Sequence, residues 1–190
     1  MGMPVQDVST RWTAEMARGL PEDGKRYEVL DGELFVTPSP TWDHQTVLDL
    51  FHALLRPYVR SHRLGWLRWS PADIEFSPTR LVQPDLFVVP ARPEGRPRSW
   101  ADVKDLLLAI EALSPSTAHT DRVKKRLIYQ DEGVDEYWIV DAQARLVERW
   151  RPGDTRPEII NGTLEWQPQV GLEPLRIDLP ALFDEVVGAG

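Results

Sequence analysis

The sequence predicts a mixed α/β (α+β) fold, and three observations support this. Short runs rich in Val, Leu, Ile and Trp alternate with Gly-, Pro- and Asp-containing turns, as β-strands do. Two longer stretches carry apolar residues at helical spacing between a Ser-Pro start and a Gly end. These strands and helices alternate along a chain of 190 residues, a length that suits a single domain.

The composition limits the classes of function that remain. Hydrophobic residues make up 42% of the chain and charged residues 27%, as in an ordinary soluble protein. Runs long and apolar enough for a membrane span are missing, as is a signal-peptide core, so we expect no membrane contact. The absence of cysteine excludes disulfides and thiolate metal sites and fits a cytoplasmic location.

The net charge of −8 argues against a dedicated nucleic-acid coat protein, because phosphate binding draws on Lys and Arg. The charge is nevertheless uneven along the chain. Basic residues gather in three places: Arg56, Arg60, Arg63 and Arg68; Arg92, Arg96 and Arg98; and Arg122, Lys124, Lys125 and Arg126. A local basic surface on an acidic protein is therefore compatible with the composition.

An N-terminal hairpin is the clearest local motif. Strands at 26–30 and 33–36 flank the dipeptide Asp31-Gly32, which favours a two-residue hairpin turn. Under the pairing that this turn sets, Glu28 and Glu33 lie on the same face of the hairpin. The opposite face, with Tyr27, Val29, Leu34 and Val36, is wholly apolar.

Turn and cap signals predict the remaining elements. Ser39-Pro40 opens an amphipathic helix that Gly65 ends, and Ser114-Pro115 opens a second helix that Gly133 ends. A short helix is expected at 11–18. Further strands are predicted at 66–69, 74–76, 84–89, 106–113 and 137–140. The last part of the chain predicts a β-meander with strands at 145–151, 157–160, 163–166 and 175–177.

Two carboxylates stand inside apolar strands, where an uncompensated charge is costly. Asp85 lies in Pro84-Asp85-Leu86-Phe87-Val88, and Glu111 lies in Ala109-Ile110-Glu111-Ala112-Leu113. We expect such carboxylates to be paired, protonated or bound to a metal. If the two strands are neighbours, the side chains converge, and their oxygens with the carbonyl of Ala112 suit Mg²⁺ or Mn²⁺.

The helix that follows Glu111 adds a cation to this candidate site. Asp121, Lys125 and Tyr129 are spaced four residues apart and therefore share one helix face. A metal together with a nearby cation supplies what phosphodiester hydrolysis needs. Lys124 lies about 100° around the helix from Lys125, so only one of the two lysines can face the site.

Structural alternatives remain for each of these residues. Asp85 could be a turn or N-cap residue, and Lys125 could be a solvated lysine in a basic helix. Glu28 could serve solubility at a hairpin edge. Secondary candidates, which could instead cap, pack or support the helix and hairpin, are Glu33, His44, Asp121 and Tyr129.

Motifs spread over residues 26–151 carry a family resemblance. They are Tyr27-Glu28-Val29-Leu30-Asp31-Gly32-Glu33-Leu34, Ser39-Pro40 with His44, Pro84-Asp85, Glu111-Ala112-Leu113-Ser114-Pro115-Ser116-Thr117, Asp121, Lys125, Tyr129, Gly133-Val134 and Glu136-Tyr137-Trp138-Ile139-Val140-Asp141. In order and spacing they resemble the Uma-type family of predicted bacterial endonucleases, a branch of the restriction-endonuclease-like, PD-(D/E)XK, fold. The resemblance implies a mixed central sheet flanked by helices and an Mg²⁺-dependent phosphodiesterase site.

The resemblance also implies roles for single residues. Asp85 corresponds to the aspartate of the motif and Glu111 to its second acid, and both would bind the metal. The general motif expects a lysine two residues after Glu111, where this chain has Leu113. The catalytic lysine is then expected from the following helix, at Lys125, and Glu28 is favoured over Glu33 as a further acid.

We therefore expect one domain over 1–190, with a lead-in at 1–25, a nuclease-like core at 26–151 and C-terminal strands and a tail at 152–190. The expected function is an Mg²⁺- or Mn²⁺-dependent endonuclease, with DNA favoured over RNA. Its expected nucleic-acid contacts are Arg56, Arg60, Arg63, Arg92, Arg96 and Lys124. The alternative is a catalytically inactive nucleic-acid-binding or dimeric assembly module of the same fold, and a homodimer fits either hypothesis.

Overall fold

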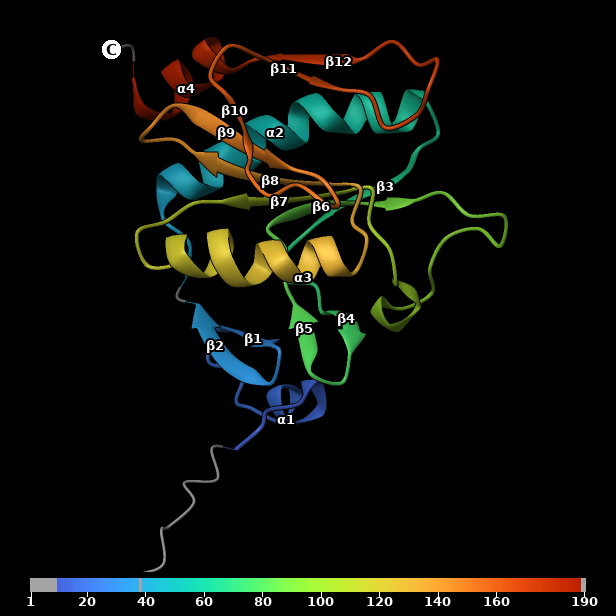
Figure 1. The fold of residues 1–190 in the computed structure, drawn as a ribbon, viewed down its shortest axis with the longest axis vertical. Coiled ribbons are helices and arrows are strands. Elements are labelled where there is room, and N and C mark those ends of the chain that lie inside the picture. The colour runs from blue at the N-terminus through green and yellow to red at the C-terminus, as the bar shows by residue number, and fades with distance from the viewer. Residues whose placement is uncertain (1–9, 38, 189–190) are drawn as a thin grey trace, which may run out of the picture.

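The computed structural model describes residues 10–37 and 39–188. A six-stranded sheet forms the middle layer, and helices lie on both of its faces (Figure 1). The elements follow the chain in this order: α1 (Ala14–Arg18), β1 (Arg26–Leu30), β2 (Glu33–Thr37), α2 (Trp42–Ser61), β3 (Gly65–Trp69), β4 (Ile74–Ser77), β5 (Arg80–Val82), β6 (Leu86–Pro90), the 3₁₀ helix η1 (Trp100–Asp102), β7 (Leu108–Ala112), the π-helical turn η2 (Thr120–Lys125), α3 (Arg126–Asp131), β8 (Glu136–Asp141), β9 (Leu146–Trp150), β10 (Glu158–Ile160), β11 (Thr163–Trp166), β12 (Leu175–Asp178) and α4 (Leu179–Val187). The predicted mixed α/β fold with helices flanking a central sheet is confirmed.

The central sheet has the strand order β10-β9-β8-β7-β6-β3. Strands β7 and β8 are parallel and their other neighbours are antiparallel, so the sheet is mixed. A parallel pair needs a crossover connection, which η2 and α3 supply here. The sheet ends at β3 on one side and at β10 on the other.

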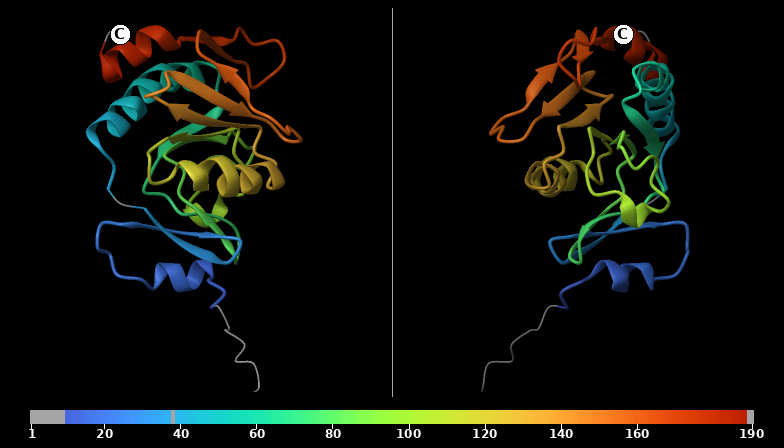
Figure 2. Two further views of the ribbon diagram at one scale, coloured as in Figure 1. Left: turned by 60° about the vertical axis from the view of Figure 1, so that its left-hand side comes forward. Right: turned by 90° about the vertical axis from the view of Figure 1, so that its right-hand side faces the viewer.

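Helix α2 covers one face of this sheet. Its buried Val47, Phe51 and Leu55 pack against apolar side chains of β6, β7 and β8. Helix α4 and the small sheet of β11 and β12 pack against α2, and Trp166 of β11 also meets Trp138 of β8, with ring centroids 6.1 Å apart (Figure 2). Trp138 and Trp166 are almost fully buried there.

The opposite face is covered by α3 and by a four-stranded sheet with the order β2-β1-β5-β4. The buried Ile128 and Tyr129 of α3 pack between the two sheets. The hairpin of β1 and β2 has the predicted register, with Glu28 opposite Phe35. Helix α1 packs beneath the hairpin, against its apolar face (Figure 1).

Two predicted helix boundaries are wrong. Helix α2 begins at Trp42, because the hydroxyl of Thr41, not of Ser39, accepts the capping hydrogen bond from the His44 amide at 3.3 Å. The helix ends at Ser61, whereas Gly65 belongs to β3. The hydroxyls of Ser39 and Thr41 have nearly equal capping ability, which local patterns do not rank. At the other end Arg63, and not Gly65, takes the left-handed conformation after the helix, with a φ of 54°.

The C-terminal region differs more from its prediction. The expected meander is split, because β9 and β10 extend the central sheet whereas β11 and β12 pair with each other. The sequence prediction missed α4, although Asp178 caps it by accepting a hydrogen bond from the Ala181 amide at 3.1 Å. It also missed β5, a strand of three residues. Short elements of this kind are stabilised by what they pack against rather than by their own pattern.

Each helix in the described ranges is too short or too polar to cross a lipid bilayer. Residues 1–9 of the predicted lead-in and 189–190 of the predicted tail lie outside the described residues. The division into lead-in, core and tail stays a prediction.

Candidate active site

Asp85 and Glu111 lie on neighbouring strands. Strand β6 pairs with β7 so that Leu86 is opposite Ile110, and the next residues outward, Asp85 and Glu111, therefore face each other on one side of the sheet. The backbone amide of Ala112 donates to Asp85 Oδ2 at 3.0 Å. Both carboxylates are about 2% exposed. The strand pairing thus brings together two acids that are far apart in the sequence.

Asp85 is held by two further side chains. The guanidinium of Arg26 donates to its Oδ1, and His44 Nε2 lies 3.2 Å from its Oδ2. Burial would raise the pKa of Asp85, but the contact with His44 and the charge of Arg26 hold it well below its usual range. Asp85 is therefore an ionised carboxylate in its protein environment.

Lys125 lies at the centre of three acids, and we call this group the acid–lysine cluster: Glu28, Glu111, Asp121 and Lys125. Its Nζ is 2.9 Å from Glu28 Oε1, 3.0 Å from Glu111 Oε1 and 3.6 Å from Asp121 Oδ1. Lys125 is only 3% exposed. Burial would lower the pKa of Lys125, but the surrounding carboxylates outweigh burial and raise it well above its usual value. The ammonium is therefore charged.

The acids of the cluster repel one another and are poorly solvated. Burial, with the nearby carboxylates, raises the pKa of Glu111 well above its usual value, although Lys125 opposes this effect. The hydroxyl of Tyr129 donates to Glu111 Oε1 at 3.1 Å. Burial also raises the pKa of Asp121, whose Oδ1 has no hydrogen bond within the described part of the chain. The raised pKa values of Glu111 and Asp121 therefore favour a further cation or a proton at this place.

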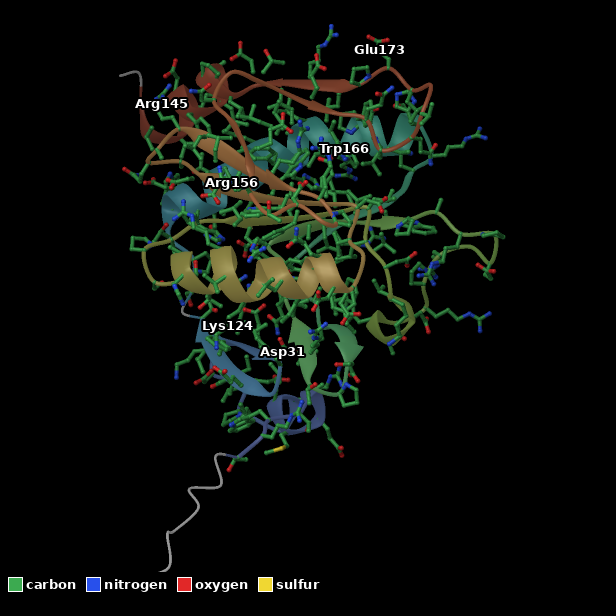
Figure 3. All side chains as sticks on the ribbon, viewed as in Figure 1. Asp31, Lys124, Arg145, Arg156, Trp166 and Glu173 are labelled. Carbon is green, nitrogen blue, oxygen red and sulfur yellow. The ribbon has the colours of Figure 1, made fainter. Side chains whose placement is uncertain are left out.

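Glu28 joins the cluster, whereas Glu33 does not. Glu28 is 1% exposed and accepts a hydrogen bond from the Gln83 amide at 2.8 Å in addition to its contact with Lys125. Glu33 is exposed and pairs with Lys124. Figure 3 shows Lys124 between the helix η2–α3 and the hairpin of β1 and β2. The side chain of Lys125 therefore lies inside the acid–lysine cluster, whereas that of Lys124 lies outside it.

The predicted nucleic-acid contacts fall into three groups. Arg92 pairs with Asp105 and Lys124 with Glu33, so the charge of each is already compensated. Four arginines line one cavity of about 510 Å³ between α2 and β3 and have no carboxylate partner among residues 10–37 and 39–188: Arg56, Arg60, Arg63 and Arg68. Arg96 lines a separate cavity with Arg98.

Sequence reasoning missed two residues of the site. Arg26 contacts Asp85, and its signal was its position two residues before Glu28 on the same strand face. Gln83 holds Glu28 through its backbone amide and directly precedes Pro84-Asp85. Neither residue type is a metal ligand of first choice, so a search for acids passes over both.

A cavity of about 200 Å³ opens onto these groups, and we call it the site cavity. Its walls include Asp85, Glu111, Asp121 and Lys125, together with the Ser114–Thr117 segment that leads into the helix. The acids of the sheet and the lysine of the helix therefore face the same space. A ligand in the site cavity would meet them together.

The donor chemistry fits a hard divalent cation. The site contains four carboxylates and two cations, so two negative charges remain in excess when all four acids are ionised and His44 is neutral. The carboxylates are Glu28, Asp85, Glu111 and Asp121, and the cations are Arg26 and Lys125. Asp121 Oδ1, which has no hydrogen bond within the described residues, also fits a cation at this place. In the described ranges, no three His, Asp or Glu side chains are arranged as ligands of one metal ion. Binding would therefore require Arg26, His44 or Lys125 to release a carboxylate oxygen.

The mixed sheet flanked by helices is a fold of the restriction-endonuclease-like class. Beside it, acids of the neighbouring strands β6 and β7 meet a lysine of the helix η2–α3. The chain belongs to the Uma2 family, described as "Putative restriction endonuclease", whose model matches residues 14–180. A similar solved structure is described as a "putative nuclease belonging to DUF820" from Anabaena variabilis, with 19% identity and a TM-score of 0.75. That match covers 92% of this chain and 99% of the other. None of the curated proteins matches this chain.

Proposed function

We propose that this protein is a divalent-metal-dependent endonuclease that hydrolyses phosphodiester bonds in nucleic acid, with DNA favoured over RNA. Membership of the Uma2 family supports a nuclease, and the description of that family supports DNA. One observation carries the mechanism: a buried lysine contacts Glu111 in the cavity that also contains Asp85.

In this proposal Asp85 and Glu111 hold Mg²⁺ or Mn²⁺, because both are carboxylates on one side of the sheet. A bound divalent ion supplies Lewis-acid polarisation of the phosphate and a bound water of lowered pKa. Lys125 holds a permanent positive charge beside the developing charge on the phosphate. Glu28 and Asp121 fix the position of that ammonium, and Tyr129 fixes Glu111.

Arg26 and His44 orient Asp85 before substrate arrives. Because Arg26 donates to Asp85 within the site, its guanidinium is a second cation close to where a phosphate would bind. A guanidinium binds phosphate oxygens in pairs, so Arg26 can exchange its carboxylate partner for the substrate. His44 and the Ala112 amide then keep Asp85 in place.

The test compares three isosteric amide variants in cleavage of DNA with Mg²⁺, with Mn²⁺ and with a chelator. Asp85→Asn and Glu111→Gln are expected to lose more than about 100-fold in rate, beyond the effect of losing an outer-shell partner. Glu33→Gln is the matched control, because Glu33 lies outside the acid–lysine cluster, and its rate should stay unchanged. Circular dichroism establishes that each variant is folded.

Unchanged cleavage by Asp85→Asn and Glu111→Gln would overturn the assignment and point to a contaminating nuclease. A second candidate function, a non-catalytic nucleic-acid-binding module, is favoured by one observation: both oxygens of Asp85 already have protein partners. Calorimetry separates the two candidates. Failure to bind Mg²⁺ or Mn²⁺ at millimolar concentration, with nucleic-acid binding intact, supports the second.

A further inference from the structure

A second, larger cavity adjoins the proposed catalytic site. Its volume is about 660 Å³, and Arg26, His44 and Asp85 line it as well as the site cavity. We call it the side cavity. Its other wall includes the aromatic rings of His52 and Trp69. A molecule that reaches Asp85 from this side therefore passes an indole.

Trp69 is held close to the catalytic acid by the sheet. It is the last residue of β3 and lies opposite Leu86, the residue next to Asp85 on β6. The amide of the following residue, Ser70, donates to the Asp85 carbonyl oxygen at 3.1 Å. The indole itself lies on the α2 side of the sheet with His52, and it shares the lining of the side cavity with Asp85.

The indole itself is available to a ligand. Trp69 is 55% exposed, whereas Trp138 and Trp166 are almost fully buried. The ring of His52 meets it edge-on, with centroids 5.0 Å apart and planes at 81°. An edge-on neighbour supports an aromatic ring without stacking on its face. Trp69 is therefore a supported, partly exposed aromatic surface.

The side cavity continues into the arginine-lined cavity between α2 and β3. Both cavities share His52 and Trp69. Along α2, His44 and His52 line the side cavity, and His52, Arg56 and Arg60 line the arginine-lined cavity. We call these residues the stripe, which turns by about 40° around the helix with each step of four residues. From position 44 to 60 this stripe is about 24 Å long. A track thus leads from the carboxylates past an indole to the arginines of α2.

We propose that Trp69 stacks on an unpaired base next to the scissile phosphate, and that the strand continues along the arginines of α2. The substrate class is then nucleic acid with a single-stranded segment at the cleavage site. A base inside a duplex is stacked on both faces and cannot offer one to an indole, whereas an unpaired base can. This inference rests on the proposed function for the identity of the ligand.

A polar group of the side cavity agrees with this occupant. Gln83 lines the side cavity and is 9% exposed. Its Nε2 donates to Asp73 Oδ1 at 2.8 Å, which fixes the orientation of the amide. Its Oε1 then has no hydrogen-bond donor among the residues that the structure describes. The wall of the side cavity therefore contains a buried acceptor without a partner among the described residues, which the N–H donor of a nucleobase edge would reach after a movement of the Gln83 amide.

The test measures binding without metal, so that cleavage does not enter. Three labelled probes of equal length are compared by fluorescence anisotropy: a single strand, the same strand with abasic sites, and a duplex. Trp69→Ala should weaken single-strand binding by about 5- to 100-fold, as expected for loss of one base–aromatic stack. Binding of the abasic strand and the duplex should stay unchanged, and Trp69→Phe should retain most of the single-strand affinity.

Trp42→Ala is the matched control, because Trp42 is 84% exposed and lines neither cavity of the track. Its single-strand affinity should equal that of the unmodified protein. Tighter binding of the duplex than of the single strand would overturn the inference, as would equal losses on all three probes in Trp69→Ala. Either result with Mg²⁺-dependent cleavage intact leaves the proposed function standing. Failure to bind any of the three probes would overturn both.

Discussion

Lys124 and Lys125 are adjacent in the sequence but differ in burial and in their charged partners. Lys125 is buried among carboxylates at 2.9 to 3.6 Å. Lys124 is partly exposed, pairs with the exposed Glu33 and lies over the ring of Phe35 at 4.7 Å. A buried charge that loses its partner is costly, whereas an exposed ion pair contributes little. The turn of about 100° between adjacent helix positions directs the two side chains to these different surroundings.

The two lysines give a matched pair of variants. Lys125→Met should lower the free energy of unfolding by about 3 kcal/mol at neutral pH, because it leaves the buried acids without their cation. Its cleavage rate should fall by about 100-fold or more, as for loss of one transition-state donor. Lys124→Met should change the free energy of unfolding by less than about 1 kcal/mol. Urea titration and the cleavage assay measure both, and similar losses in the two variants would contradict the assignment of Lys125.

Asp121 gives a pH-dependent prediction for the metal-free protein. Because burial raises its pKa above the ordinary 3.8, the folded state holds this proton more tightly than the unfolded state does. Stability therefore falls as the pH rises from about 3.8 through the raised pKa. Asp121→Asn removes the penalty and should be more stable than the unmodified protein above that window, by about 1.4 kcal/mol for each tenfold tightening of proton binding on folding.

Below pH 3.8 the gain of Asp121→Asn should disappear, because the acid is then protonated in both states. Urea midpoints measured over a series of pH values in the presence of a chelator test this. A gain that persists unchanged at low pH would show that packing, and not charge, is responsible.

At the scale of elements, the position of β3 depends on one glycine. Gly65 pairs with Pro90 and has a φ of +144°, and a Cβ added to it would lie 1.9 Å from the Val89 carbonyl oxygen. That contact involves backbone on both sides, so it cannot be relieved by a side-chain rotation. Strand β3 carries Trp69 and closes one edge of the central sheet.

Gly65→Ala should therefore destabilise the protein by about 3 kcal/mol, the upper end of the cost of a strained backbone position. Gly162→Ala is the matched control, since an added Cβ there meets nothing within 4 Å and the backbone is not in the left-handed region. Thermal or urea unfolding compares the two. Equal effects of the two substitutions would show that the approach of β3 to β6 is not tight.

At the scale of the whole molecule, an acidic protein carries a basic face. The net charge of −8 opposes binding to nucleic acid at long range. The arginines of α2 lie together without carboxylate partners among the described residues, whereas Arg92 is paired with Asp105. Binding to nucleic acid should therefore depend on a few local charges rather than on the total.

The combined variant Arg56→Gln, Arg60→Gln and Arg63→Gln tests this point. The slope of log affinity against log salt concentration should become shallower by about 2, at roughly 0.7 to 0.9 for each lost phosphate contact. Arg92→Gln should change the slope much less, because its charge is already compensated. Salt titrations with a labelled strand measure both slopes, and equal changes would exclude α2 as the main phosphate contact.

Homodimerisation and the cytoplasmic location stay predictions. Sedimentation measurements of the purified protein test the homodimer.

The local features of this protein could be predicted from its amino-acid sequence. Turn chemistry at Asp31-Gly32 set the hairpin register, and apolar runs around Asp85 and Glu111 predicted strands with costly acids. The spacing of Asp121, Lys125 and Tyr129 predicted one helix face, and all three side chains are buried on it. Each of these features depends on contacts within one or two elements, which a periodic pattern encodes.

Which side chains meet in the site depends on how distant elements pack together. The contacts of Arg26 with Asp85 and of Glu28 with Lys125 join residues that are distant in the sequence, as does the indole of Trp69 beside Asp85. The same holds for α4 and for the separate pair β11–β12, which are stabilised by packing on α2. Such contacts depend on how layers stack, and the hydrophobic burial that drives stacking is not directional enough to be read from a local pattern.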